Sequence, residues 1–132
     1  MNKTRENRFL VDEAVEKLER GEVWALYRFW SLYQSLDKEP NDEDRFWYAN
    51  MLYHFGVALE KYNHHEQALR VFSECVSKFG SDSDADTAYL VSQSALNAGI
   101  VLGRASRFTE AIQQLDACIT RLRSASAGRT RP

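Results

Sequence analysis

The chain has 132 residues, of which 44% are hydrophobic and 27% are charged, and its formal net charge is −2. This length and composition fit one domain with enough apolar residues for a core. The sequence pI of about 5.9 argues against nucleic acid as a partner, because a phosphate backbone is bound by a clustered basic face. The N-terminal residues are charged throughout, and no stretch reaches the ~18 uninterrupted apolar residues of a membrane span. We therefore expect a cytoplasmic protein without a membrane partner.

Apolar residues recur at helical spacing along the whole chain, and turn signals divide it into about six helices. No convincing strand is present, so the pattern predicts an all-α fold. Residues 125–132 lack this periodicity and end in proline, which predicts a frayed C-terminal tail. The expected helices cover residues 4–20, 23–37, 43–61, 65–79, 85–105 and 107–124.

Particular residues mark the predicted helix ends. Gly21 ends the first helix, Pro40 breaks the chain after the second, and Asn41 or Asp42 can cap the third. Gly80, which is able to take a left-handed cap conformation, ends the fourth helix before an acidic linker. The second helix is unusually aromatic, and aromatic residues at helical spacing typically fill a core, so we expect packing rather than a ligand cage. Its aromatic residues are Trp24, Tyr27, Phe29, Trp30 and Tyr33.

Two stretches of the chain align without a gap at an offset of 43 residues. A fixed period of ~20 to 50 residues indicates stacked units that cannot bury their apolar faces alone. The identical residues include two cysteines on the apolar side of predicted helices, where a buried free thiol packs as a small hydrophobe. The identities pair Gly56, Leu59, Ala68 and Cys75 with Gly99, Leu102, Ala111 and Cys118.

These units resemble tetratricopeptide repeats, a family of antiparallel helix pairs stacked into a right-handed superhelix. The resemblance covers about residues 46–122, although the period of 43 exceeds the family's ~34 residues. It implies a right-handed α-solenoid of about three pairs in one domain, residues 1–124: a divergent pair at 4–38 and repeats at 43–80 and 85–124. In the first repeat it rests on Leu52, Phe55, Gly56, Leu59, Ala68, Phe72 and Cys75, and in the second on Ala95, Ala98, Gly99, Leu102, Phe108, Ala111, Leu115 and Cys118.

No residue pattern indicates catalysis, a cofactor or a metal. Asp82, Asp84 and Asp86 alternate as in a calcium loop, but Thr87 stands where that loop needs glycine, so we interpret these carboxylates as helix caps. Three histidines without a nearby cysteine do not suggest a zinc site. Phosphate loops and nucleophile motifs are absent from the sequence. We therefore expect a protein that is not an enzyme.

The resemblance implies binding of a peptide or protein, because in this family the first helix of each pair lines a concave groove. The helical register selects the residues that turn toward that groove. They mix apolar groups, amides and cations, which suits a peptide with a few anchors and an acidic group. An alternative is that Val57, Leu96 and Ile100 are buried against another helix or a second copy. The predicted groove residues are Asn50, Tyr53, His54, Val57 and Lys61 on the third helix and Gln93, Leu96, Asn97, Ile100 and Arg104 on the fifth.

Three functions are compatible with this scaffold. The leading hypothesis is a nonenzymatic adaptor that recognises a protein or peptide through the groove. The first alternative is a small inhibitor or immunity-type protein that blocks a toxin or enzyme through the acidic stretches 37–44 and 81–86. The second is a self-associating structural protein, such as a homodimer, in which a second copy covers Trp24, Trp30 or Ile119.

Overall fold

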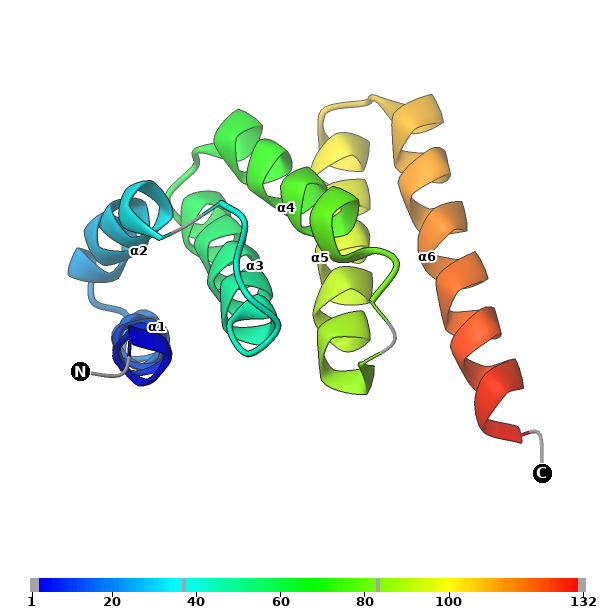
Figure 1. The fold of residues 1–132 in the computed structure, drawn as a ribbon. Helices are drawn as coiled ribbons and strands as arrows, with labels where there is room; N and C mark the ends of the chain where they lie inside the picture. The colour runs from blue at the N-terminus through cyan, green and yellow to red at the C-terminus, as the bar shows by residue number, and fades with distance from the viewer. Residues whose placement is uncertain (1–2, 37, 83, 131–132) are drawn as a thin grey trace.

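The fold, taken from a computed structural model, contains six helices, and the described residues contain no strand. The structure describes residues 3–36, 38–82 and 84–130. Within these ranges, none of the helices combines the length and the apolar character that crossing a bilayer requires. The prediction of an all-α chain with six helices is therefore confirmed (Figure 1). The helices are α1 (Lys3–Glu19), α2 (Trp24–Ser35), α3 (Arg45–Lys61), α4 (His65–Phe79), α5 (Ala85–Arg104) and α6 (Phe108–Thr130).

Each helix packs against the next one in the chain, and alternate helices also meet on one side. Helix α3 contacts α1 and α5 as well as its chain neighbours α2 and α4. The helices thus follow one another across the molecule, with α1 and α2 at one end and α6 at the other (Figure 1). The core runs through this row, and its largest fully buried side chains are Phe29, Phe55, Phe72, Phe79 and Met51.

The turns between α1 and α2, α3 and α4, and α5 and α6 share one geometry. Each contains a residue with a positive φ, at Gly21 (74°), Asn63 (66°) and Ser106 (60°). In each, the next amide donates to a carbonyl five residues earlier, as in the Glu22 to Lys17 bond of 3.0 Å. This left-handed closure satisfies carbonyls at the helix end. The prediction that Gly21 ends the first helix is confirmed, and the turn between α1 and α2 closes in the same way as the other two turns.

The contacts between α3 and α4 recur between α5 and α6. A Cβ placed on Gly56 would meet the ring of Phe72, and one placed on Gly99 would meet Leu115. Both cysteines are buried free thiols, as expected. The Cys75 thiol lies 3.8 Å from the Ala49 carbonyl oxygen, and Cys118 lies 3.4 Å from that of Ser92. The 43-residue offset read in the sequence is therefore an offset between equivalent positions in space.

Several predicted helix ends differ in the structure. Gly80 follows α4 as expected, but its φ of −63° is ordinary right-handed helical geometry, so the left-handed cap is wrong. Asn41 accepts a bond from the Asp44 amide at 2.9 Å in the turn before α3 and does not cap that helix. Helix α6 continues to Thr130, so residues 125–130 are helical rather than frayed, since no proline interrupts them before residue 132. Residues 131 and 132 lie outside the described chain.

Candidate functional site

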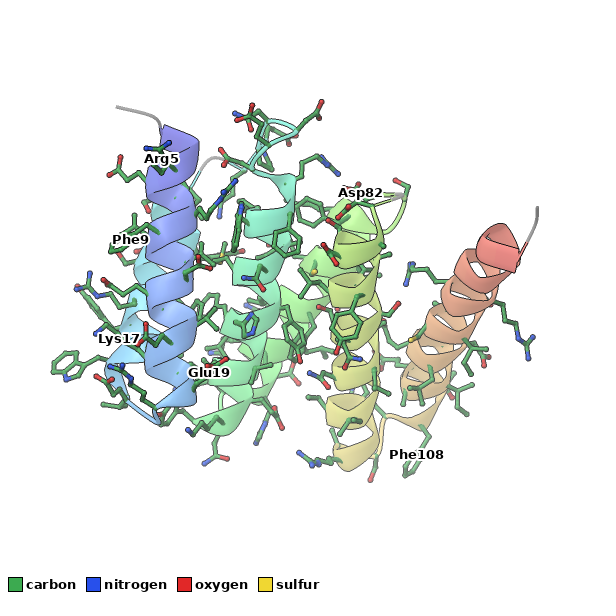
Figure 2. All side chains as sticks on the ribbon, turned by 90° about the horizontal axis from the view of Figure 1, so that it is seen from below. Arg5, Phe9, Lys17, Glu19, Asp82 and Phe108 are labelled. Atoms are coloured by element: carbon green, nitrogen blue, oxygen red, sulfur yellow. The ribbon has the colours of Figure 1, made fainter. Side chains whose placement is uncertain are left out.

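The ten predicted groove residues come from α3 and α5, which lie side by side. Figure 2 looks onto the side of the molecule formed by α1, α3 and α5. On this side the predicted residues form a group toward α1 and a group between α3 and α5. Two apolar side chains of α5, Leu96 and Ile100, are exposed. The two groups have different contacts.

The group toward α1 is centred on His54. Its Nδ1 donates to the Asn50 carbonyl at 3.0 Å, and its ring stands edge-on to Tyr53 with centroids 4.9 Å apart. Burial lowers the pKa of His54, while the bond to Asn50 and the nearby Glu19 carboxylate of α1 oppose this change. His54 is therefore a neutral packing residue near neutral pH, and it is not free to bind an acidic group.

The group between α3 and α5 joins the two helices. Burial raises the pKa of Tyr53, and a hydrogen bond with the Asn97 side chain opposes that rise. Next to this bond lies a small hollow of about 180 Å³, to which α3 contributes Val57 and α5 contributes Ile100 and Arg104. The structure thus brings five of the predicted residues together, but two of them are already bonded to each other.

The two cations of the predicted groove have different surroundings. The Arg104 guanidinium lies 3.2 Å from one carboxylate oxygen of Glu60. The other oxygen of Glu60 accepts a hydrogen bond from His65 at 2.7 Å. Lys61 is exposed, and its ammonium lies 5.8 Å from the ring centroid of Tyr62. An incoming acidic group would therefore compete with Glu60 for Arg104 and meet less opposition at Lys61.

A larger apolar hollow lies on the other side of the molecule, at the start of α2. Its volume is about 530 Å³, and none of its lining residues is acidic, lysine or arginine. Trp24 is 68% exposed, Tyr27 65% and Trp30 49%, so the expectation that the aromatic residues of this helix fill the core is wrong for these three. We call this surface the aromatic hollow; it is lined by Val23, Trp24, Leu26, Tyr27, Trp30, Phe55, Leu59, His64 and Gln67.

At the far end of α2, away from the aromatic hollow, a hydrogen bond joins this helix to α4. There, the Tyr33 hydroxyl donates to Glu74 of α4 at 2.7 Å. This bond raises the pKa of Tyr33 to about 12, with burial adding to the effect. Near Trp24 and Trp30, by contrast, α4 contributes Gln67 at the rim, and the floor consists of Phe55 and Leu59 of α3.

The equivalent space between α4 and α6 has the opposite character. Its lining is mainly polar, and Arg107 crosses it to reach Glu66 at 3.2 Å and Glu110 at 2.8 Å. Because the same helix arrangement fills one space with ion pairs and leaves the other apolar, the aromatic surface is not a general result of the packing. The sequence indicated Trp24 and Trp30 as a surface only in the alternative of a homodimer, and it did not predict a hollow. Aromatic residues on more than one side of the second helix were a signal that a single core could not cover them all.

The acidic linker is engaged within the protein. Asp82 accepts two bonds from the Arg45 guanidinium, at 2.9 and 2.5 Å. Asp84 caps α5 by accepting from both the amide and the hydroxyl of Thr87, at 3.0 and 2.9 Å, so the predicted capping role is confirmed there. Within the described part of the chain, no three His, Cys, Asp or Glu side chains are grouped as a metal site would require.

No family model matches the chain, and no curated protein or solved structure shows significant similarity to it.

Proposed function

We propose that this chain is a nonenzymatic protein-interaction module. In this proposal its helices form three antiparallel pairs stacked as a right-handed α-solenoid of the tetratricopeptide type. The shared turns at Gly21, Asn63 and Ser106 and the repeated contacts of the two cysteines support the equivalence of the units. A stack of this kind acts through its surfaces, so function depends on which surface is built to be covered.

The aromatic hollow is the observation that carries the proposal. Soluble proteins rarely leave a contiguous group of large apolar side chains in water, and Trp and Tyr dominate the binding energy of many interfaces. No lysine, arginine or carboxylate lines this hollow, so recognition there depends on apolar anchors of the partner rather than on charge. The partner chemistry that fits is an amphipathic helix of another protein, with two or three large apolar side chains on one face.

The side formed by α1, α3 and α5 is a second candidate surface for a peptide. It offers the exposed cation Lys61 and the hollow beside Ile100 and Arg104. This hollow has about a third of the volume of the aromatic hollow, and its one amide, that of Asn97, already interacts with Tyr53. The inhibitor alternative has less support, because two carboxylates of its acidic surface are already engaged within the protein. Asp82 binds Arg45, and Asp84 caps α5.

Affinity capture with matched surface variants tests the proposal. Wild-type protein is compared with Trp24→Ala plus Tyr27→Ala, with Lys61→Glu on the other side, and with Ser31→Ala, which is exposed on α2 outside the hollow. Captured proteins from a lysate of the source cells are quantified after circular dichroism shows equal helicity. A partner retained by wild type, Lys61→Glu and Ser31→Ala but lost with the double variant supports the aromatic hollow.

Two other results decide against that surface. A partner lost only with Lys61→Glu would move the interface to the side of α1, α3 and α5. If every captured protein binds all four forms equally, neither surface recognises a protein, and the proposed recognition through the aromatic hollow is wrong.

A further inference from the structure

We infer that the C-terminal end of the helix row is an interface with a second copy of this chain. The relevant surface is an apolar face on α5 and α6, which we call the end face. Its four side chains are between 37% and 58% exposed, although all are large and aliphatic. They are Leu96 and Ile100 of α5 and Ile112 and Ile119 of α6.

The 43-residue repeat indicates what kind of element covers such a face. The equivalents of the end face in the preceding pair are Tyr53, Val57, Leu69 and Val76. All four are partly buried and packed against the core, because α5 lies against both α3 and α4. The end face therefore reproduces the surface on which α5 docks, and among the described residues no further helix occupies it. A helix is the occupant that this geometry accepts.

The spacing on α6 suits a helix that pairs with a copy of itself. Ile112, the half-buried Leu115 and Ile119 follow one another at intervals of three and four residues, which is the spacing of a seam between two helices. A two-fold axis beside Leu115 would set Ile112 of each copy against Ile119 of the other. Two-fold contacts of this kind bury the same surface on both copies at once.

The area of the end face is sufficient for a dimer. Helix α5 has 20 residues, and two helices about 30 Å long and 10 Å wide present roughly 600 Å². Two copies would therefore bury roughly 1,200 Å² in total, which is the lower limit of the ~1,200–2,000 Å² that specific interfaces bury.

The exposed face of α1, at the opposite end of the molecule, does not offer an apolar partner for this face. On the outer side of α1, Phe9 is exposed, as Figure 2 shows. The residues that follow it at helical spacing are Asp12 and Glu16, which are exposed and charged. Head-to-tail stacking through α1 would bury these carboxylates against isoleucines, which is unfavourable. The α6 seam, by contrast, buries the same surface on both copies, so that arrangement closes at two copies.

Sedimentation equilibrium over a wide range of protein concentration tests this inference. We expect the wild-type mass to rise from 15.2 kDa toward twice that value and then to stay constant. The variant Ile112→Glu plus Ile119→Glu should dissociate at least ~100-fold more readily, because the seam would bury like charges. Phe9→Glu places a charge on a similarly exposed apolar residue at the other end and should behave as wild type.

A second measurement maps the seam directly. The two-fold axis sets residue 112 of each copy against residue 119 of the other, so the double variant Ile112→Cys plus Ile119→Cys should form disulfides between copies under mild oxidation, whereas Ser31→Cys on α2 should not. Three results would overturn the inference: a wild-type mass of 15.2 kDa at every concentration, dimerisation of the glutamate variant equal to that of wild type, or a mass that continues to grow beyond two copies.

Discussion

The close approach of α3 and α4 at Gly56 makes a quantitative prediction for Gly56→Ala. A Cβ at this position would lie 2.6 Å from Cδ1 and 2.8 Å from Cζ of Phe72. Phe72 is fully buried, so its ring would have to shift within the packed core to admit this carbon. Gly103 offers a matched control, because a Cβ there would meet no atom within 4 Å.

Two opposing terms decide the change in free energy of unfolding. Alanine in place of glycine inside a helix is favourable by roughly 0.5–1 kcal/mol. Forcing an extra carbon into a filled core costs about 1–3 kcal/mol. We therefore expect Gly103→Ala, near the end of α5, to gain up to about 0.5 kcal/mol, and Gly56→Ala to lose about 1–2 kcal/mol. Gly99→Ala should lie between them, because its nearest neighbour, Leu115, is flexible and only half-buried.

Urea unfolding followed by far-ultraviolet circular dichroism measures these changes. Adding Phe72→Leu to Gly56→Ala should recover part of the loss, since the equivalent contact in the third pair is made by a leucine at 3.0 Å. A double-mutant cycle then gives a favourable coupling between the two substitutions. If Gly56→Ala proves as stable as Gly103→Ala, or the cycle shows no coupling, the close approach of α3 and α4 does not limit the side chain at residue 56.

Three further predictions follow from single residues. Burial lowers the pKa of His54, so the histidine of the unfolded chain takes up a proton first as the pH falls below ~6.5. Between about pH 7 and 5.5, the free energy of unfolding measured with urea should therefore fall more for wild type than for His54→Gln, by at most about 1.4 kcal/mol per pH unit. Burial raises the pKa of the Cys75 thiol to about 11, although Ser94 opposes this rise, so disulfide-exchange reagents should label it only on unfolding, and rapid labelling of the native protein would contradict this. Ser106→Gly removes the strain of a left-handed residue and should raise stability by up to about 1 kcal/mol in urea unfolding, whereas Gly21→Ala should lower it by about the same amount.

Local patterns predicted the helices well because each signal acts within a few residues. The predicted fourth helix, residues 65–79, coincides with α4, and Gly21 takes the positive φ that ends α1. The offset of 43 residues correctly paired Gly56 with Gly99 as sites of close helix approach. Where the prediction failed at helix ends, as at Gly80, more than one local geometry was compatible with the residue.

Exposure was harder to predict, because it depends on which helices are neighbours in space. Trp24 and Phe29 both belong to the same aromatic stretch, yet Phe29 is fully buried and Trp24 projects into solvent. Helical spacing separates these faces, but it does not say that α2 has a neighbour on only one of them. In the same way, Tyr53 and Asn97 were predicted as two separate groove residues, and only the packing of α3 against α5 shows that they bond to each other.

The proposed binding surface and the proposed dimer interface are compatible, because they lie toward opposite ends of the row of helices (Figure 1). A dimer joined through the end faces of α5 and α6 leaves both aromatic hollows on α2 uncovered. Two identical sites on one rigid particle bind a partner with two copies of the target helix more tightly than one site does, provided both can be reached together. Ile112→Glu plus Ile119→Glu should therefore weaken capture of a dimeric partner while leaving its affinity for a single isolated helix unchanged. Equal loss of both affinities would mean that the partner itself contacts the end face.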